Sequence, residues 1–69
     1  MEEYLYVGKV LDKDNNIIFS EARYPIKASS ERSARRILLN VLSRRLKMPS
    51  RDINLHGYLY KESERNFDG

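Results

Sequence analysis

Two stretches near the start of the chain, residues 4–11 and 17–28, are rich in aromatic and β-branched residues. Such side chains suit the pleated surface of a sheet, so each stretch predicts a β-strand. The five residues between them, DKDNN, are turn formers that tolerate left-handed backbone angles, and they predict an antiparallel hairpin. Pro25 has no backbone N–H to donate, so we expect the second strand to lie at an edge of the sheet or to bend there.

Apolar residues next recur with helical spacing. They fall at i, i+3, i+4, i+7 and i+8, which predicts an amphipathic helix with a buried stripe made of Ala34, Ile37, Leu38, Val41 and Leu42, extended by Leu46. Ser30 or the serine before it can cap the helix, and Pro49 requires the helix to end near Lys47 or Met48. Apolar and polar positions alternate again in residues 53–62, which predicts a third strand.

The predicted elements follow in the order strand, strand, helix, strand. The hairpin makes the first two strands antiparallel, and a right-handed crossover through the helix returns the third strand parallel to the second. The expected fold is α+β, of the ββαβ type, with a three-stranded antiparallel sheet in the order 2-1-3 and one helix packed on one face. We expect residues 1–62 to form a single domain and residues 63–69 to form a flexible C-terminal tail.

One helix covers only one face of the sheet, so alternation along each strand should divide its side chains between a covered and an open face. The covered face is expected to hold Leu5, Val7, Leu11, Ile18, Ala22, Tyr24, Ile26, Ile53, Leu55 and Leu59. Lys9 fits poorly among these residues, which leaves either a bulge near Gly8 or a different register in the first strand. In the expected register the open face carries five aromatic residues, namely Tyr4, Tyr6, Phe19, Tyr58 and Tyr60.

Three roles are open to this aromatic face. Tyrosine is common on strands and keeps its hydroxyl in water, so the face can simply be solvated. It can instead form the centre of a protein interface, including a homodimer, because tyrosine offers a large rigid contact area with a polar tip. Exposed aromatic rings can also stack on unpaired bases, at about 1 to 3 kcal/mol per base.

Positive charge is concentrated in the middle of the chain. The net charge of +3 balances 13 basic against 10 acidic residues, but residues 23–51 carry nine basic residues and only Glu31 as an acid. Seven of the nine lie in the predicted helix and the loop after it, namely Arg32, Arg35, Arg36, Arg44, Arg45, Lys47 and Arg51. We expect those on the helix to flank its buried stripe as a broad cationic surface.

This cationic surface has three interpretations. Arginine presents a planar fork of donors that matches two phosphate oxygens, and such binding is favourable but sensitive to salt. The surface can instead dock on an acidic protein. It can also be a solvated helix face, since arginine is a good helix former and cations near the C-terminal end offset the helix dipole.

Residue types that support catalysis or metal binding are scarce. The chain has no cysteine and one histidine, His56, which leaves no disulfide and no evident zinc ligands. Asp12, Asp14 and Asn16 alternate like the start of a calcium loop, but the required glycine and distant glutamate are missing, so a turn is expected. We therefore expect neither enzymatic activity nor a cofactor. No apolar run approaches the roughly 18 residues of a membrane span, and no secretory signal pattern is evident, so we expect a cytoplasmic protein without membrane contact.

The order of residues also resembles a known family. The segments YVGKV, FSEARYPIKASSERSA and LSRRLKMPSRDINL are similar to the archaeal large-ribosomal-subunit protein family LX. The similarity runs through Val7, Gly8, Phe19, Glu21, Ala28, Ser30, Glu31, Ala34, Ser43, Arg44, Arg51 and Ile53. Two positions depart from the family, which usually has a glycine where Leu42 stands and a histidine where Arg45 stands. The resemblance implies the same order of strands and helix and an RNA partner.

These patterns favour a non-enzymatic binding module. Our first expectation is contact with the phosphates of RNA, ahead of DNA, through the cationic helix and Arg51, without readout of the base sequence. The alternative is a protein-binding module, such as a small regulator or inhibitor of the size that viruses and mobile elements encode. Such a module would dock on an acidic partner or form a homodimer through its aromatic sheet face.

Overall fold

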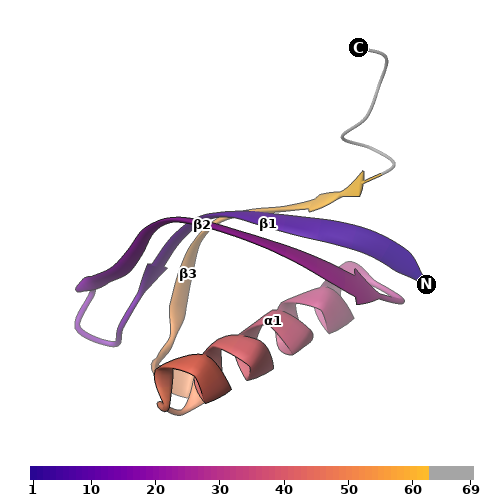
Figure 1. The fold of residues 1–69 in the computed structure, drawn as a ribbon. Coiled ribbons are helices and arrows are strands. Elements are labelled where there is room, and N and C mark those ends of the chain that lie inside the picture. The colour runs from indigo at the N-terminus through magenta and orange to yellow at the C-terminus, as the bar shows by residue number, and fades with distance from the viewer. Residues whose placement is uncertain (63–69) are drawn as a thin grey trace.

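The computed structural model describes residues 1–62, which form a three-stranded sheet with one helix on one of its faces (Figure 1). The elements are strand β1 (Glu2–Leu11), strand β2 (Ile17–Ala28), helix α1 (Glu31–Leu46), the short 3-10 helix η1 (Ser50–Asp52) and strand β3 (Asn54–Lys61). The sheet order is β2-β1-β3, and both neighbouring pairs are antiparallel. The predicted α+β fold of the ββαβ type is therefore confirmed. The tail predicted for residues 63–69 lies outside the described residues.

Asp12 organises the five-residue turn between β1 and β2. Its Oδ1 accepts hydrogen bonds from the backbone N–H groups of Asn16, at 2.9 Å, and Asp14, at 2.8 Å. The bond from the Asn16 backbone is the largest of several hydrogen bonds that hold the pKa of the Asp12 carboxyl below its ordinary value. Asn15 takes the left-handed conformation that such a turn requires, with φ of 67°. The alternating polar residues thus form a turn, as predicted.

Helix α1 is closed at both ends by hydrogen bonds. The Oγ of Ser30, the N-cap, accepts from the backbone N–H of Ser33 at 3.2 Å. At the other end Lys47 is left-handed, with φ of 56°, and the Met48 N–H donates to the Ser43 carbonyl at 3.2 Å. These caps confirm the predicted start of the helix and its end before the proline at position 49.

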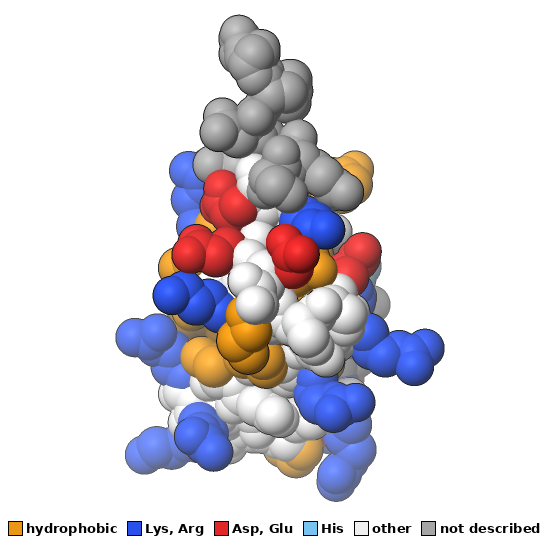
Figure 2. Space-filling view, turned by 90° about the vertical axis from the view of Figure 1, so that its right-hand side faces the viewer, with side chains coloured by type: hydrophobic (Ala, Val, Ile, Leu, Met, Phe, Trp, Pro, Cys, Tyr) orange, Lys and Arg blue, Asp and Glu red, His pale blue; other side chains and the backbone are white. Residues whose placement is uncertain are grey.

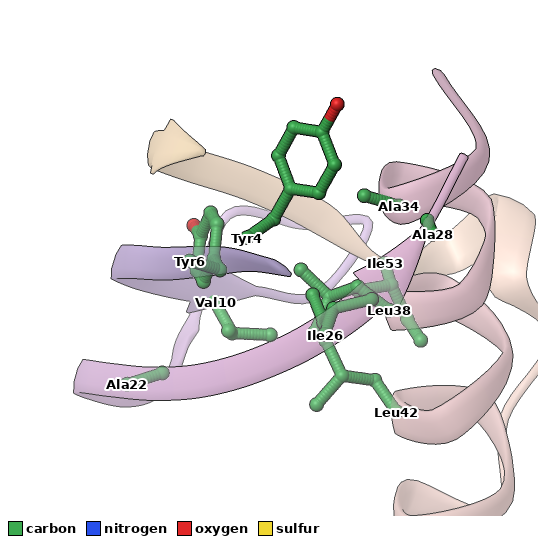
Figure 3. Close-up of a cluster of buried hydrophobic side chains, with 10 residues drawn as sticks. All are labelled: Tyr4, Tyr6, Val10, Ala22, Ile26, Ala28, Ala34, Leu38, Leu42 and Ile53. Carbon is green, nitrogen blue, oxygen red and sulfur yellow. The ribbon is translucent and has the colours of Figure 1, made fainter. Parts of the chain in front are cut away.

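A cluster of ten buried side chains fills the space between α1 and the covered face of the sheet (Figure 3). Its members are Tyr4, Tyr6, Val10, Ala22, Ile26, Ala28, Ala34, Leu38, Leu42 and Ile53. On α1 the buried positions recur every four residues, at Ala34, Leu38 and Leu42. Ile37 and Val41, which the pattern assigns to the same stripe, lie on the flank of the helix and are 36% and 43% exposed. The buried stripe is therefore narrower than predicted.

The face of β1 that meets the helix is the opposite of the predicted one. Tyr4 and Tyr6 are only 6% and 3% exposed and belong to the core, so the prediction that they lie on the open face is wrong. Leu5 and Val7 lie on the open face, half-buried. Lys9 shares that face, because β1 pairs with β3 without a shift in register from residue 4 to residue 11. The poor fit of Lys9 thus reflects the register and not a bulge in β1.

The irregularities of the sheet lie in β2. Its register against β1 shifts between Gly8 and Val10 and again between Val10 and Leu11, and each shift adds one residue to β2. As a result Phe19 lies opposite Val10 and packs against the core, whereas simple alternation predicts it on the open face. Figure 1 shows the sheet arching over α1, and no other helix or strand of residues 1–62 lies on its other face.

Glycines make room for the ring of Tyr6 on the covered face. Gly8 and Gly57 lie directly opposite each other on β1 and β3. A Cβ on Gly57 would come within 2.5 Å of the Gly8 Cα and 2.9 Å of the Tyr6 hydroxyl, both closer than real contacts allow. The hydroxyl of Tyr6 donates instead to the Lys9 carbonyl at 2.6 Å. The pair of glycines therefore explains why a large polar ring can be buried here.

Candidate functional site

All seven basic residues predicted as a site are exposed. Arg32, Arg36 and Arg44 form a diagonal row on α1 that spans about 18 Å along the axis, at a rise of about 1.5 Å per residue. The row winds around the helix, so that Arg44 lies about 120° from Arg32 at about 3.6 residues per turn. Burial raises the pKa of the Tyr6 phenol, and Arg35 is close enough for its charge to oppose that rise. Arg45 borders β2. The remaining two follow the helix, Lys47 at its C-cap and Arg51 in η1.

None of these seven cations forms an ion pair within residues 1–62. The two ion pairs in that part of the chain both lie on the sheet and join Lys27 to Glu3, at 4.0 Å, and Lys61 to Glu2, at 3.7 Å. In Figure 2 most basic side chains project from both flanks at the level of the helix, and the acidic ones gather higher, at the level of the sheet. The charge of the helix surface is therefore available to a partner.

A shallow depression adjoins this surface at the edge of the sheet. Its volume is about 450 Å³, and it is lined by Phe19, Glu21, Ala22, Arg23, Tyr24 and Arg45. It is open to solvent and carries two cations and one acid. The depression extends the positive surface of α1 onto the outer edge of β2.

The open face of the sheet carries two of the five predicted aromatic residues. Tyr58 and Tyr60 are 70% and 40% exposed, their ring centroids are 6.1 Å apart, and their planes are inclined by 37°. Tyr58 lies opposite Val7, and Tyr60 lies opposite Leu5. The other three, Tyr4, Tyr6 and Phe19, are buried or partly buried against the core.

The same face holds cations that the sequence interpretation did not assign to a site. Arg23 lies opposite Val7 on β2, and Lys9 lies opposite His56 on β3, both exposed. The signal that would have identified them was Lys9 itself. Its charge excludes it from the core, and alternation then places Leu5 and Val7 on the open face with it.

Within residues 1–62 no group of three histidine, aspartate or glutamate side chains is placed to hold a metal ion, and every buried side-chain nitrogen or oxygen has a hydrogen-bond partner. No helix in the same range, α1 included, is both long enough and apolar enough to cross a bilayer. The groups presented for binding are guanidinium, ammonium and aromatic side chains.

No protein-family model matches the chain, and neither does a curated protein or a solved structure. Function is therefore inferred from the surface itself.

Proposed function

We propose that this protein is a non-enzymatic module that binds nucleic acid phosphates, RNA ahead of DNA, through the outer surface of α1. The observation that supports it is the row of exposed arginines that no described carboxylate neutralises. Each guanidinium can donate two parallel hydrogen bonds to one phosphate, and contacts of this kind position a protein without reading sequence. The resemblance to the ribosomal family LX favours RNA as the partner.

The arrangement of these arginines lowers the stability of the isolated helix. Arg32 lies in the first turn, where the positive end of the dipole disfavours a cation by about 0.3 to 1 kcal/mol. Arg32 and Arg36 form a like-charged pair at i,i+4, which costs a further 0.2 to 0.5 kcal/mol, approximately. If this face of the helix were only solvated, nothing would offset these losses of helix stability. A polyanion bound along the row would convert both into favourable interactions.

A second candidate is docking on an acidic protein, and one observation favours it. Ile37 and Val41 are 36% and 43% exposed on the flank of α1, Val41 one turn and Ile37 two turns from Arg44 and Arg45. Apolar side chains beside arginines are typical of the centre and rim of a protein interface. Affinity capture from the native host, with and without nuclease, separates the two candidates, because only nucleic acid partners disappear on nuclease treatment.

A salt titration tests the nucleic acid proposal. The Arg36→Gln/Arg44→Gln variant should bind a labelled duplex more weakly than the wild type. Its plot of log K against log salt should be shallower by about 1.8, because each phosphate contact with a duplex contributes about 0.9 to the slope. Fluorescence anisotropy at a series of salt concentrations measures both quantities.

The control variant is Lys13→Gln/Lys27→Gln, which has the same net charge but changes the hairpin and the sheet. It should keep the wild-type slope. The proposal is contradicted if the wild type does not bind at low salt, if binding does not depend on salt, or if the two variants lose affinity equally.

A further inference from the structure

The open face of the sheet is a second exposed surface, of a different kind from α1. Tyr58 and Tyr60 occupy successive outward positions of β3, and Leu5 and Val7 lie beside them on β1 as an apolar base. Exposed aromatic rings on a sheet are platforms on which unpaired bases stack. We infer that this face binds a single-stranded segment of nucleic acid, with one base stacked on Tyr58 and the next on Tyr60.

The two rings are placed for two separate bases. Their centroids are 6.1 Å apart and their planes are inclined by 37°, which makes them a tilted aromatic pair and not a face-to-face stack. Bases in a duplex follow one another at about 3.4 Å, and a spacing of 6.1 Å therefore needs a strand stretched to nearly twice that rise. A single strand can extend in this way. A duplex cannot, because its bases are held within the stack.

The charge on this face suits the phosphates that link the bases. Arg23 lies in the same cross-strand row as Tyr58, and Lys9 lies on the central strand. Neither forms an ion pair within residues 1–62. The nearest acid along β2 is Glu21, two residues from Arg23 toward the hairpin. Glu3 also lies on this face, but it pairs with Lys27 at 4.0 Å, at the end of the sheet nearer Tyr60. The positive charge of Arg23 and Lys9 is therefore local to the Tyr58 end of the face.

The size of the face argues against a second copy of the chain as its occupant. Three strands about 4.8 Å apart, with 8 to 12 residues at about 3.3 Å each, give a surface of roughly 14 Å by 26 to 40 Å. That is about 370 to 560 Å², whereas a stable interface buries about 800 Å² on each partner. Two stacked bases fit within the smaller area.

This inference shares a nucleic acid partner with the proposed function but depends on a different surface. Helix α1 covers one face of the sheet (Figure 1), and the strand register and exposure place Tyr58 and Tyr60 on the other. A duplex held on the arginines does not reach the tyrosines. Either proposal can therefore fail while the other holds.

Binding of a labelled single strand of about ten nucleotides and of a duplex with the same sequence tests the inference. The Tyr58→Ala/Tyr60→Ala variant should bind the single strand about 5- to 150-fold more weakly for each base that no longer stacks, and the duplex as tightly as the wild type. The matched control, Tyr58→Phe/Tyr60→Phe, keeps both rings and should keep the wild-type affinity for the single strand.

The single variant Tyr58→Ala distinguishes weaker binding from unfolding, since this side chain is 70% exposed and contributes little to the core. Unchanged thermal melting with weakened single-strand binding supports the inference. Three results would overturn it. They are a wild type that does not bind the single strand, a double alanine variant that binds it as well as the wild type does, and a wild-type dimer that the alanine variant converts to a monomer. The Arg36→Gln/Arg44→Gln variant, measured on the duplex, reports separately on α1.

Discussion

Tyr6 is a polar aromatic residue held in the core with its hydrogen-bonding capacity satisfied. It is 3% exposed, and its hydroxyl donates to the Lys9 carbonyl at 2.6 Å. Burial raises the pKa of its phenol above the ordinary value of 10.0, and the charge of Arg35 and a hydrogen bond with the His56 backbone oppose this shift. The folded protein therefore favours the neutral phenol.

Replacing Tyr6 with Phe should lower the free energy of unfolding by about 1 kcal/mol at neutral pH, the typical contribution of one hydrogen bond. Because the folded pKa is above the unfolded one, this tyrosine's contribution to wild-type stability is full below about pH 10 and is lost as pH rises through the folded pKa. The Tyr6→Phe variant should not show this part of the loss of stability at alkaline pH. Urea unfolding from neutral pH to about pH 11 measures both effects, and an equally steep loss in the variant contradicts the assignment.

Gly57 should not tolerate a side chain. An added Cβ would lie 2.4 Å from the Val7 carbonyl oxygen and 2.5 Å from the Gly8 Cα, so β1 and β3 would have to separate. We expect Gly57→Ala to lower the free energy of unfolding by about 1 to 3 kcal/mol, the usual cost of overpacking. Urea unfolding of Gly57→Ala beside His56→Ala, an exposed neighbour, measures it. Equal stability of the two variants would show that the strands separate freely here.

Single residues decided where sequence-based prediction succeeded on this sheet and where it failed. Ala22 and Ile26 are buried as predicted, because alternation in that part of β2 is regular. Alternation groups Leu5 and Val7 with the covered face and so predicts Tyr4 and Tyr6 on the open one. The space beside Tyr6 comes from Gly57, about fifty residues away in the sequence. A local pattern does not reveal such a distant cause.

The elements themselves were predictable because their periods are local. The hairpin, α1 and β3 follow from turn residues, helical spacing and alternation, and the structure has them at nearly the expected bounds. The two register shifts in β2 were not predictable, since a bulge depends on how two strands pair and not on either strand alone. The exposure of Ile37 and Val41 has a similar origin, because it depends on how α1 lies against the sheet.

The start of α1 depends on one side chain. Ser30 accepts a hydrogen bond from the Ser33 N–H, and Arg32 already disfavours the first turn, so loss of the cap should not be compensated there. Ser30→Ala should lower the free energy of unfolding by about 1 kcal/mol. Ser20→Ala, an exposed serine in β2, is the control. Chemical denaturation of both variants checks this, and a Ser30→Ala variant as stable as its control would contradict the capping role.

Charge and fold are arranged together at the level of the whole molecule. The exposure of all seven basic residues could be predicted, because an apolar stripe on a helix leaves its cations outside. The sequence could not predict whether acidic residues from other elements neutralise these basic residues, since that depends on tertiary structure. Among residues 1–62 the sheet places Glu2 and Glu3 beside Lys61 and Lys27, away from the helix surface. The strength of the candidate site thus results from the placement of the carboxylates.

Helix α1 lies on one face of a sheet that forms the only other layer of residues 1–62 (Figure 1), and the register places Tyr58 and Tyr60 on the opposite face. The two proposed surfaces therefore lie on opposite sides of the described domain, where each can contact its own ligand. If both surfaces bind as proposed, the protein acts as a spacer that bridges a paired and an unpaired segment, and the first contact raises the local concentration of the second. As the salt concentration rises, the nucleic acid on α1 should then dissociate before the strand on the tyrosines, because stacking depends less on counterions than phosphate binding does.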